Sequence, residues 1–212
     1  VDGYKMPGAK FFPNARLNFS ENLLVRDDDT DALVFWGEDK VKTRISWCDL
    51  NIAVSKFSQA LRAEGIKKGD RVCGYMPNMV ETVIAMLGTA AIGATWSSAS
   101  PDFGVQGVVD RFGQIEPKLM ITVDGYHYNG KSHDIREKVR DVVDRITTIQ
   151  KVVIVKYAFD GTNTTGIRNG VSYDNFLAPF SPEKIVFEQV EFNHPLYVMF
   201  SSGTTGKPKC IV

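Results

Sequence analysis

The residues best suited to chemistry form one short string near the end of the 212-residue chain. Its glycines let the backbone approach a ligand closely, and its hydroxyls, amides and lysine ammonium groups are the donors that phosphate oxygens accept. The string therefore predicts a loop that binds a triphosphate. The candidate phosphate-binding residues are Ser201, Ser202, Gly203, Thr204, Thr205, Gly206, Lys207 and Lys209.

Two other phosphate-binding motifs do not fit the spacing of this string. A Walker loop requires glycine at the position of Ser201 and a serine or threonine at the position of Pro208. No Gly-x-Gly-x-x-Gly sequence opens a helix after a strand, so a dinucleotide-binding site of the Rossmann type is not supported. The bland alternative is a solvated linker rich in serine and threonine.

A strand is needed to position the string. The apolar run at residues 196–200 (LYVMF) directly precedes it and predicts a buried strand. In open α/β sheets, ligands bind where the strands end at their carboxyl edge. The place of the string in the chain thus supports the same interpretation as its composition.

The rest of the chain alternates between strand and helix patterns. The alternation predicts an α/β fold, a mostly parallel sheet with flanking helices joined by right-handed crossovers. Asn78 with Glu81, and later Ser132, are the expected helix caps. Residues 159–170 are expected to form a polar surface loop. The expected strands span residues 32–36, 42–47, 71–76, 94–98, 118–123, 151–156 and 196–200, and the expected helices span 48–64, 79–92, 105–115 and 132–146.

Composition excludes several classes of function. Lys and Arg together number 25, as do Asp and Glu, so a net charge of zero offers no broad charge pattern to nucleic acid or an anionic membrane. No apolar run reaches the roughly 18 residues of a membrane-spanning helix. The three widely spaced cysteines fit neither a disulfide framework nor a metal site. We expect a cytoplasmic protein that binds small molecules, with no nucleic acid or membrane partner.

The string resembles the signature loop of the AMP-forming adenylating superfamily, which contains acyl-CoA synthetases, luciferases and the adenylation domains of peptide synthetases. Members usually carry glycine where this chain has Cys210. That difference, together with the blocks at residues 12–24 (FPNARLNFSENLL) and 92–104 (IGATWSSASPDFG), resembles the acetoacetyl-CoA synthetase branch in particular. The resemblance covers essentially the whole chain.

This resemblance implies part of the large N-terminal domain of an adenylate-forming enzyme. It divides the chain into an N-terminal segment at residues 1–30 and a partial adenylating domain at 31–212, which stops just after the phosphate-binding loop. Relatives place their catalytic lysine and their adenine and ribose contacts downstream of that loop. We therefore expect no catalytic residue and no metal ligand in this chain, no adenylation by the chain alone, and self-association through an unpaired sheet edge.

The chemistry implied by the resemblance has two steps and uses ATP, Mg²⁺ and CoA. A carboxylate, here acetoacetate, attacks the α-phosphorus of ATP and gives an acyl-adenylate and pyrophosphate. The thiol of CoA then displaces AMP. The signature loop closes over the β- and γ-phosphates in relatives.

A CoA site is also implied by the resemblance to acetyl-CoA synthetases. An aromatic residue there lies against the CoA adenine, and two basic residues meet the CoA phosphates. The matching positions are Phe103, Tyr128 and Lys131, although Tyr128 stands where relatives often have arginine. The alternatives are a core aromatic for Phe103 and an ordinary solvated lysine for Lys131.

Three other functions remain open from the sequence. A ligase for acetate, propionate or another short acid shares the signature loop, because no complete acyl pocket lies in this chain. A luciferase-like or peptide-synthetase domain also shares the loop but matches residues 12–24 poorly. The alternative from another class is a non-catalytic module that binds a nucleotide or CoA.

Overall fold

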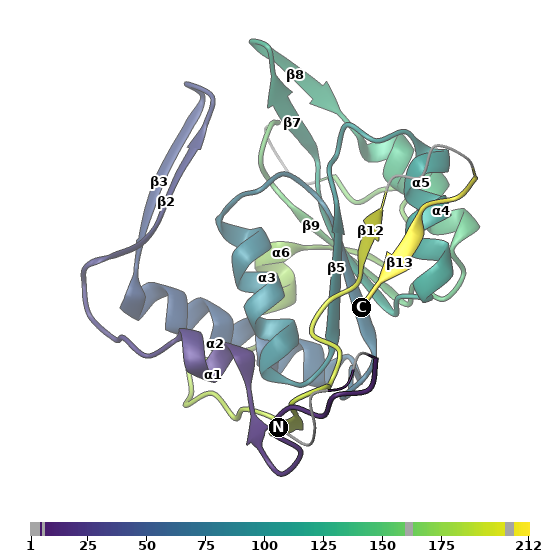
Figure 1. Cartoon of the computed structure of the whole chain (residues 1–212). Helices are drawn as coiled ribbons and strands as arrows, with labels where there is room; N and C mark the ends of the chain where they lie inside the picture. Colours follow the sequence, from purple (N-terminus) through teal and green to yellow (C-terminus); the bar gives the residue numbers. More distant parts are fainter. Residues whose placement is uncertain (1–4, 6, 160–162, 202–205) are drawn as a thin grey trace.

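The computed structural model describes residues 5, 7–159, 163–201 and 206–212. Its centre is a five-stranded parallel sheet with the strand order β10-β9-β6-β4-β5 (Figure 1). The predicted α/β class is therefore confirmed. The strands are β4 (Arg71–Tyr75), β5 (Thr95–Ala99), β6 (Leu119–Val123), β9 (Lys151–Val155) and β10 (Gly170–Ser172).

Helices cover both faces of this sheet. The chain passes from β4 to β5 and then returns to the other side of β4 as β6, so right-handed crossovers place the connecting helices on opposite faces. Figure 1 shows α1, α2 and α3 on one side of the sheet and α4 with α5 on the other. The helices are α1 (Phe19–Leu23), α2 (Trp47–Ala63), α3 (Val80–Ala91), α4 (Val105–Ile115), α5 (Arg136–Arg145) and α6 (Tyr173–Leu177).

Short antiparallel pairs surround the sheet. Two of them, the β2–β3 and β7–β8 hairpins, rise past the same end of the molecule (Figure 1). Because β7 follows β6 directly, this is the end where the parallel strands have their carboxyl termini. The pairs are β2 (Asp31–Gly37) with β3 (Val41–Ser46), β7 (Gly125–Tyr128) with β8 (Lys131–Asp134), β1 (Arg16–Leu17) with β11 (Val190–Glu191), and β12 (Met199–Ser201) with β13 (Lys209–Ile211).

The hydrophobic core lies around β6. All five residues of this strand are buried, because helices cover the sheet on both sides. Burial on both faces also explains why β6 and β9 read as continuous apolar runs rather than as alternating patterns.

One predicted helix start is wrong. Ser132 caps no helix but lies in β8, and α5 begins at Arg136. The cause is the pair Asn129-Gly130, whose φ angles of 51° and 73° form the two-residue turn of the β7–β8 hairpin. Asparagine and glycine are the residues that such a turn favours, and this local signal decides the structure.

A second predicted cap is also wrong. Helix α3 begins after Met79 rather than at a capping pair of Asn78 with Glu81. The hydroxyl of Thr82 accepts from the Met79 amide at 3.5 Å and donates to the Pro77 carbonyl at 2.6 Å. Two further elements were not predicted: β10, which begins at the last residue of the predicted loop at 159–170, and α6, which follows it.

The buried carboxylate of Asp124 joins the ends of β6 and β9. Its oxygens accept from the backbone amides of Tyr157, Ala158 and Phe159 at 3.0, 2.9 and 3.2 Å. The side chain is fully buried, so these three bonds replace the water that a carboxylate otherwise requires. Asp124 thus fixes the turn that leaves β9.

The N-terminal segment is attached to the sheet layer by Asn18, which is only 1% exposed. Its amide nitrogen lies 2.9 Å from the Ala90 carbonyl, 3.2 Å from that of Ala91 and 2.9 Å from that of Glu188. Its amide oxygen caps α1 by accepting from the Ser20 and Glu21 amides. The boundary at residue 30 stays a prediction, but the segment before it is bonded to α3 through this side chain.

Replacement of Asn18 by alanine should therefore destabilise the fold. Asn18→Ala removes the cap of α1 and leaves buried carbonyls short of a donor, so we expect the free energy of unfolding to fall by about 3 kcal/mol. Urea denaturation measures this change. Asn175→Ala at an exposed position is the control and should cost less than about 0.5 kcal/mol. Equal effects of the two substitutions would contradict the anchoring role.

Candidate functional site

The segment before the phosphate-binding string extends the parallel sheet beyond β5. The Trp96 amide donates to the Leu196 carbonyl at 3.0 Å, and the Val198 amide donates to the Trp96 carbonyl at 2.8 Å. The Ser97 hydroxyl also donates to the Val198 carbonyl at 2.8 Å. Residues 196–198 therefore run parallel to β5 and end at the same edge of the sheet.

This edge strand differs from the buried strand that the sequence predicts. Only Val198 is buried in the run, Met199 is 53% exposed, and the strand β12 begins at Met199. Successive side chains of a strand point to opposite faces, so Val198 is buried while Tyr197 and Met199 are exposed. An apolar run at this position therefore does not imply complete burial.

The described part of the phosphate-binding string lies at the surface. Ser201 ends β12 half-buried, Gly206 has a φ of 88°, and Lys207 and Lys209 are exposed. The predicted residues Ser202, Gly203, Thr204 and Thr205 lie outside the described residues. The string thus leaves and re-enters the antiparallel pair β12–β13 near the carboxyl edge, where solutes have access to it.

Helix α4 contacts the second half of the string. Gln114 Nε2 donates to the Pro208 carbonyl at 2.9 Å, and Lys207 Nζ lies 3.9 Å from Asp110 Oδ1. The Lys207 side chain is 74% exposed, so this ion pair contributes little to stability. The ammonium group is therefore available to a phosphate at low energetic cost.

A cleft of about 580 Å³ lies beside the string, between β5, the side chains of Phe103 and Arg111, and residues 197–200. Its walls are mainly aromatic and apolar, as in sites that hold a flat organic group. One positive charge stands among them, because the Arg111 guanidinium lies 4.4 Å from the ring centroid of Phe103. The principal wall residues are Trp96, Phe103, Arg111, Tyr197, Met199 and Phe200.

Arg111 lines the cleft and was not among the predicted site residues. It lies in α4, two helical turns after Phe103, and its Nη1 donates to the Gly107 carbonyl at 2.8 Å. The one available signal was an arginine on the helix that directly follows the block at residues 92–104. Spacing alone does not show that the helix turns this side chain toward Phe103.

Tyr75, at the end of β4, supports the turn that carries Phe103. The fully buried hydroxyl of Tyr75 lies 2.6 Å from the Phe103 carbonyl and 3.2 Å from the Pro101 carbonyl, to which it donates. Burial raises the pKa of the Tyr75 hydroxyl well above its ordinary value. Tyr75 therefore stays a neutral donor and fixes one wall of the cleft.

The predicted CoA residues fall into two places. Phe103 is 36% exposed in the cleft, whereas Tyr128 and Lys131 face one another across the β7–β8 hairpin, next to its turn. No hydrogen bond, ion pair or ring contact joins Phe103 to either of them among the residues that the structure describes. The structure thus brings Tyr128 and Lys131 together and leaves Phe103 apart from them.

The base of the hairpin does lie near the cleft. Burial, followed by the nearby Asp102 carboxylate, raises the pKa of the Tyr126 hydroxyl. Asp102 belongs to the same turn as Phe103. The hairpin and the cleft therefore border one region at the carboxyl edge of the sheet.

In the described part of the chain, no group of three or more His, Cys, Asp and Glu side chains is arranged to hold a metal ion. No helix in the same part is long and apolar enough to span a bilayer.

Comparisons with known proteins agree on one family. The sequence profile described as AMP-binding enzyme matches residues 21–212. The chain is similar to an acetoacetyl-coenzyme A synthetase of Rhizobium meliloti (strain 1021), with 55% identity over 100% of this chain and 32% of the relative. It is also similar to an acetoacetyl-CoA synthetase of Xenopus tropicalis, with 46% identity over 96% of this chain and 31% of the relative.

A solved structure supports the same relationship. The acetoacetyl-CoA synthetase from Streptomyces lividans superposes with a TM-score of 0.89 at 40% identity, over 97% of this chain and 31% of that chain. The chain thus spans about a third of the length of the relatives that it matches.

The support of the cleft by Tyr75 predicts a loss of stability in alkali. An unfolded tyrosine loses its proton near pH 10 whereas folded Tyr75 keeps it, so the free energy of unfolding should fall above about pH 10, by roughly 1.4 kcal/mol per pH unit for this residue. Tyr75→Phe should cost about 1–2 kcal/mol at pH 7 through the lost hydrogen bonds. The difference in the free energy of unfolding between Tyr75→Phe and the unchanged chain should then become smaller between about pH 10 and 11.

Urea denaturation at several pH values tests this expectation. Tyr128→Phe is the matched control at pH 7, because its ring is 67% exposed and its loss of a hydroxyl should change stability by less than about 0.5 kcal/mol. A constant difference between Tyr75→Phe and the unchanged chain up to about pH 11 would contradict the role of the buried hydroxyl.

Proposed function

The chain belongs to the AMP-binding enzyme family, and we propose that it forms part of an AMP-forming acid–CoA ligase that converts acetoacetate to acetoacetyl-CoA. One observation carries the proposal. A glycine- and hydroxyl-rich string with two lysines leaves an edge strand beside a cleft, in a chain that is 55% identical to an acetoacetyl-CoA synthetase over its whole length.

The first step of the proposed reaction forms an acyl-adenylate. A carboxylate oxygen of acetoacetate attacks the α-phosphorus of ATP, which enters with Mg²⁺, and the bond to the β-phosphate breaks so that pyrophosphate leaves. Lys207 and Lys209, with the hydroxyls and amides of residues 201–206, bind the β- and γ-phosphates and stabilise the charge on the leaving group. This role suits groups that only bind and position, since such a step depends mainly on alignment and electrostatics.

The second step transfers the acyl group to CoA. The thiol sulfur attacks the acyl carbonyl carbon, the carbon–oxygen bond to AMP breaks, and AMP leaves. In our proposal, Phe103 lies against the CoA adenine, while Tyr128 and Lys131 contact its phosphates. Tyr128 supplies a neutral hydroxyl where relatives often have a cation, so Lys131 carries the charge in this pair, and Arg111 adds a cation in the cleft. We place the reaction in the cytoplasm.

The proposal predicts a substrate order in the full-length ligase. With ATP and Mg²⁺, acetoacetate should release pyrophosphate with a higher kcat/KM than acetate or propionate, and addition of CoA should yield the thioester and AMP. If acetate or propionate released pyrophosphate with the higher kcat/KM, that acid and not acetoacetate would be the preferred substrate. If none of the acids released pyrophosphate, that result would contradict a ligase and favour a non-catalytic binding module. The 212-residue chain alone should release pyrophosphate at the background rate, because it spans about a third of its relatives.

Lys207 provides a second prediction. Lys207→Ala in the full-length ligase should lower kcat/KM for ATP about 100-fold, because a positive donor to the departing pyrophosphate is lost. Lys67→Ala is the control, since this exposed lysine precedes β4 at the opposite, amino edge of the sheet. Steady-state pyrophosphate release measures both variants. Equal rates for the two variants would remove Lys207 from the phosphate site.

A further inference from the structure

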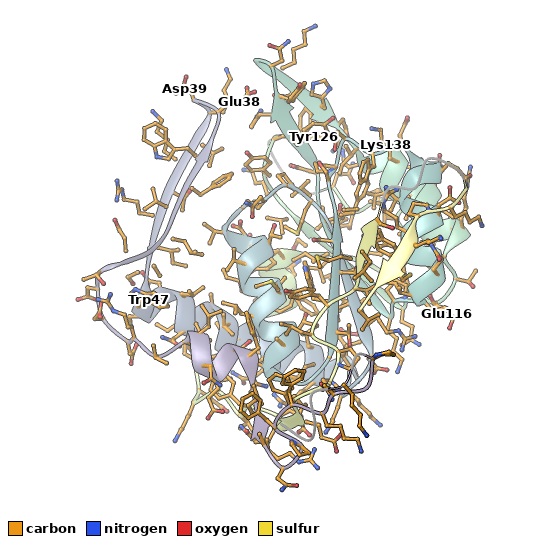
Figure 2. All side chains as sticks on the ribbon, viewed as in Figure 1. Glu38, Asp39, Trp47, Glu116, Tyr126 and Lys138 are labelled. Carbon is orange, nitrogen blue, oxygen red and sulfur yellow. The ribbon has the colours of Figure 1, made fainter. Side chains whose placement is uncertain are left out.

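The tips of the two projecting hairpins are joined by one carboxylate. Glu38 Oε1 accepts from the Asn129 amide at 2.6 Å, and Glu38 Oε2 accepts from the Gly130 amide at 3.0 Å. Glu38 follows β2 at the tip of the β2–β3 hairpin, where Figure 2 shows it beside Asp39. The contact thus connects turns that are 91 and 92 residues apart in the chain.

Backbone conformation supports a role for this side chain. Glu38 has a φ of 50°, in the left-handed region that glycine and asparagine occupy readily and that costs other residues roughly 1–2 kcal/mol. Asn129 and Gly130 show the same conformation, but with the residue types that favour it. The conformation of the turn does not explain a glutamate at position 38, whereas its two bonds to the opposite hairpin do.

A second contact joins the same two hairpins. The Tyr157 ring packs between Phe35 of β2, at 6.1 Å between ring centroids, and His127 of β7, at 5.2 Å. Gly37 makes this approach possible, because a Cβ atom at this position would lie 2.2 Å from the Tyr157 hydroxyl. Asp124 in turn holds the Tyr157 amide at 3.0 Å. The two hairpins are therefore fixed to one another and to the end of β9.

This junction determines where the predicted CoA-phosphate residues lie. Tyr128 and Lys131 directly flank the turn whose amides Glu38 holds, and they are paired with one another in the hairpin register. Both are exposed. Among the described residues, neither side chain makes a hydrogen bond, an ion pair or a ring contact, so their position depends on the backbone of the turn.

We propose that Glu38 is a positioning residue of the CoA site, whose carboxylate clamps the Asn129–Gly130 turn and thereby holds Tyr128 and Lys131 in place for a CoA phosphate. The inference rests on the proposed function. Glu38 itself does not contact the phosphate, because both of its oxygens are bonded to the turn. Those two bonds also offset the negative charge that would otherwise repel a phosphate close by.

The test uses the full-length ligase and separates its two steps. Exchange of pyrophosphate into ATP in the presence of acetoacetate reports the first step and needs no CoA, whereas thioester formation gives the KM for CoA. Glu38→Ala should raise the KM for CoA about tenfold and leave the exchange rate and the kcat of thioester formation within about twofold. Glu38→Gln keeps one acceptor oxygen and should give an intermediate KM.

Two further variants serve as controls. Asp39→Ala changes the neighbouring carboxylate, which is 94% exposed and lies 3.6 Å from Lys42 Nζ, so the KM for CoA should stay unchanged. Glu38→Gly relieves the left-handed backbone but removes the carboxylate, and it should match Glu38→Ala. Hydrogen exchange at the Asn129 and Gly130 amides gives a readout apart from activity, and it should accelerate in Glu38→Ala and Glu38→Gly but not in Asp39→Ala.

The possible outcomes distinguish this inference from the proposed function. An unchanged or lower KM for CoA in Glu38→Ala, with normal exchange, would overturn the positioning role alone. An equal fall in pyrophosphate exchange and thioester formation would also overturn it, since that pattern indicates a general structural defect. A wild-type ligase without pyrophosphate exchange would instead overturn the proposed function, and the inference with it.

Discussion

Parallel pairing is the constraint on which the candidate site depends. Because β4, β5 and residues 196–198 run in one direction, their carboxyl ends meet at one edge, although Ser97 and Val198 are 101 residues apart. Parallel strands are joined by crossover connections, and the helices in these connections cover both faces of the sheet. The phosphate-binding string and the β7–β8 hairpin follow strands that end at that edge, and the cleft lies beside these strand ends. All three therefore depend on the sheet for their position.

Much of the fold follows from the periodicity of the sequence, and the failures have local causes. The helix at residues 105–115 was predicted with its observed bounds, because its apolar positions repeat at helical spacing between a glycine and the next strand. The strands at β4, β5, β6 and β9 were predicted to within one residue at either end, and β6 and β9 in particular are mainly apolar because both of their faces are buried. The predicted helix at 132–146 began too early, because Asn129-Gly130 forms a hairpin turn and residues 131–134 form β8. The edge strand at 196–201 has an apolar face exposed to solvent, which composition alone cannot distinguish from burial.

The candidate site was predictable to a smaller degree. The string at residues 201–209 stands out by residue type, and the family profile that matches residues 21–212 agrees with it. Phe103, Tyr128 and Lys131 came from resemblance, and their roles stay predictions. Arg111 and Glu38 were not among the predicted site residues, because each contacts a partner that only the tertiary structure brings near. Such partners leave no spacing pattern in the chain.

The carboxylate of Asp124 affects which backbone amides at the carboxyl edge can bind an anion. Three successive amides after β9 form a cradle of the kind that binds phosphate in other proteins, but the Asp124 carboxylate already fills it. These three amides are therefore already bonded within the chain and are not free to bind a dissolved anion. A single buried acid thus takes up one possible anion site at this edge, and a ligand phosphate has to be bound by other groups.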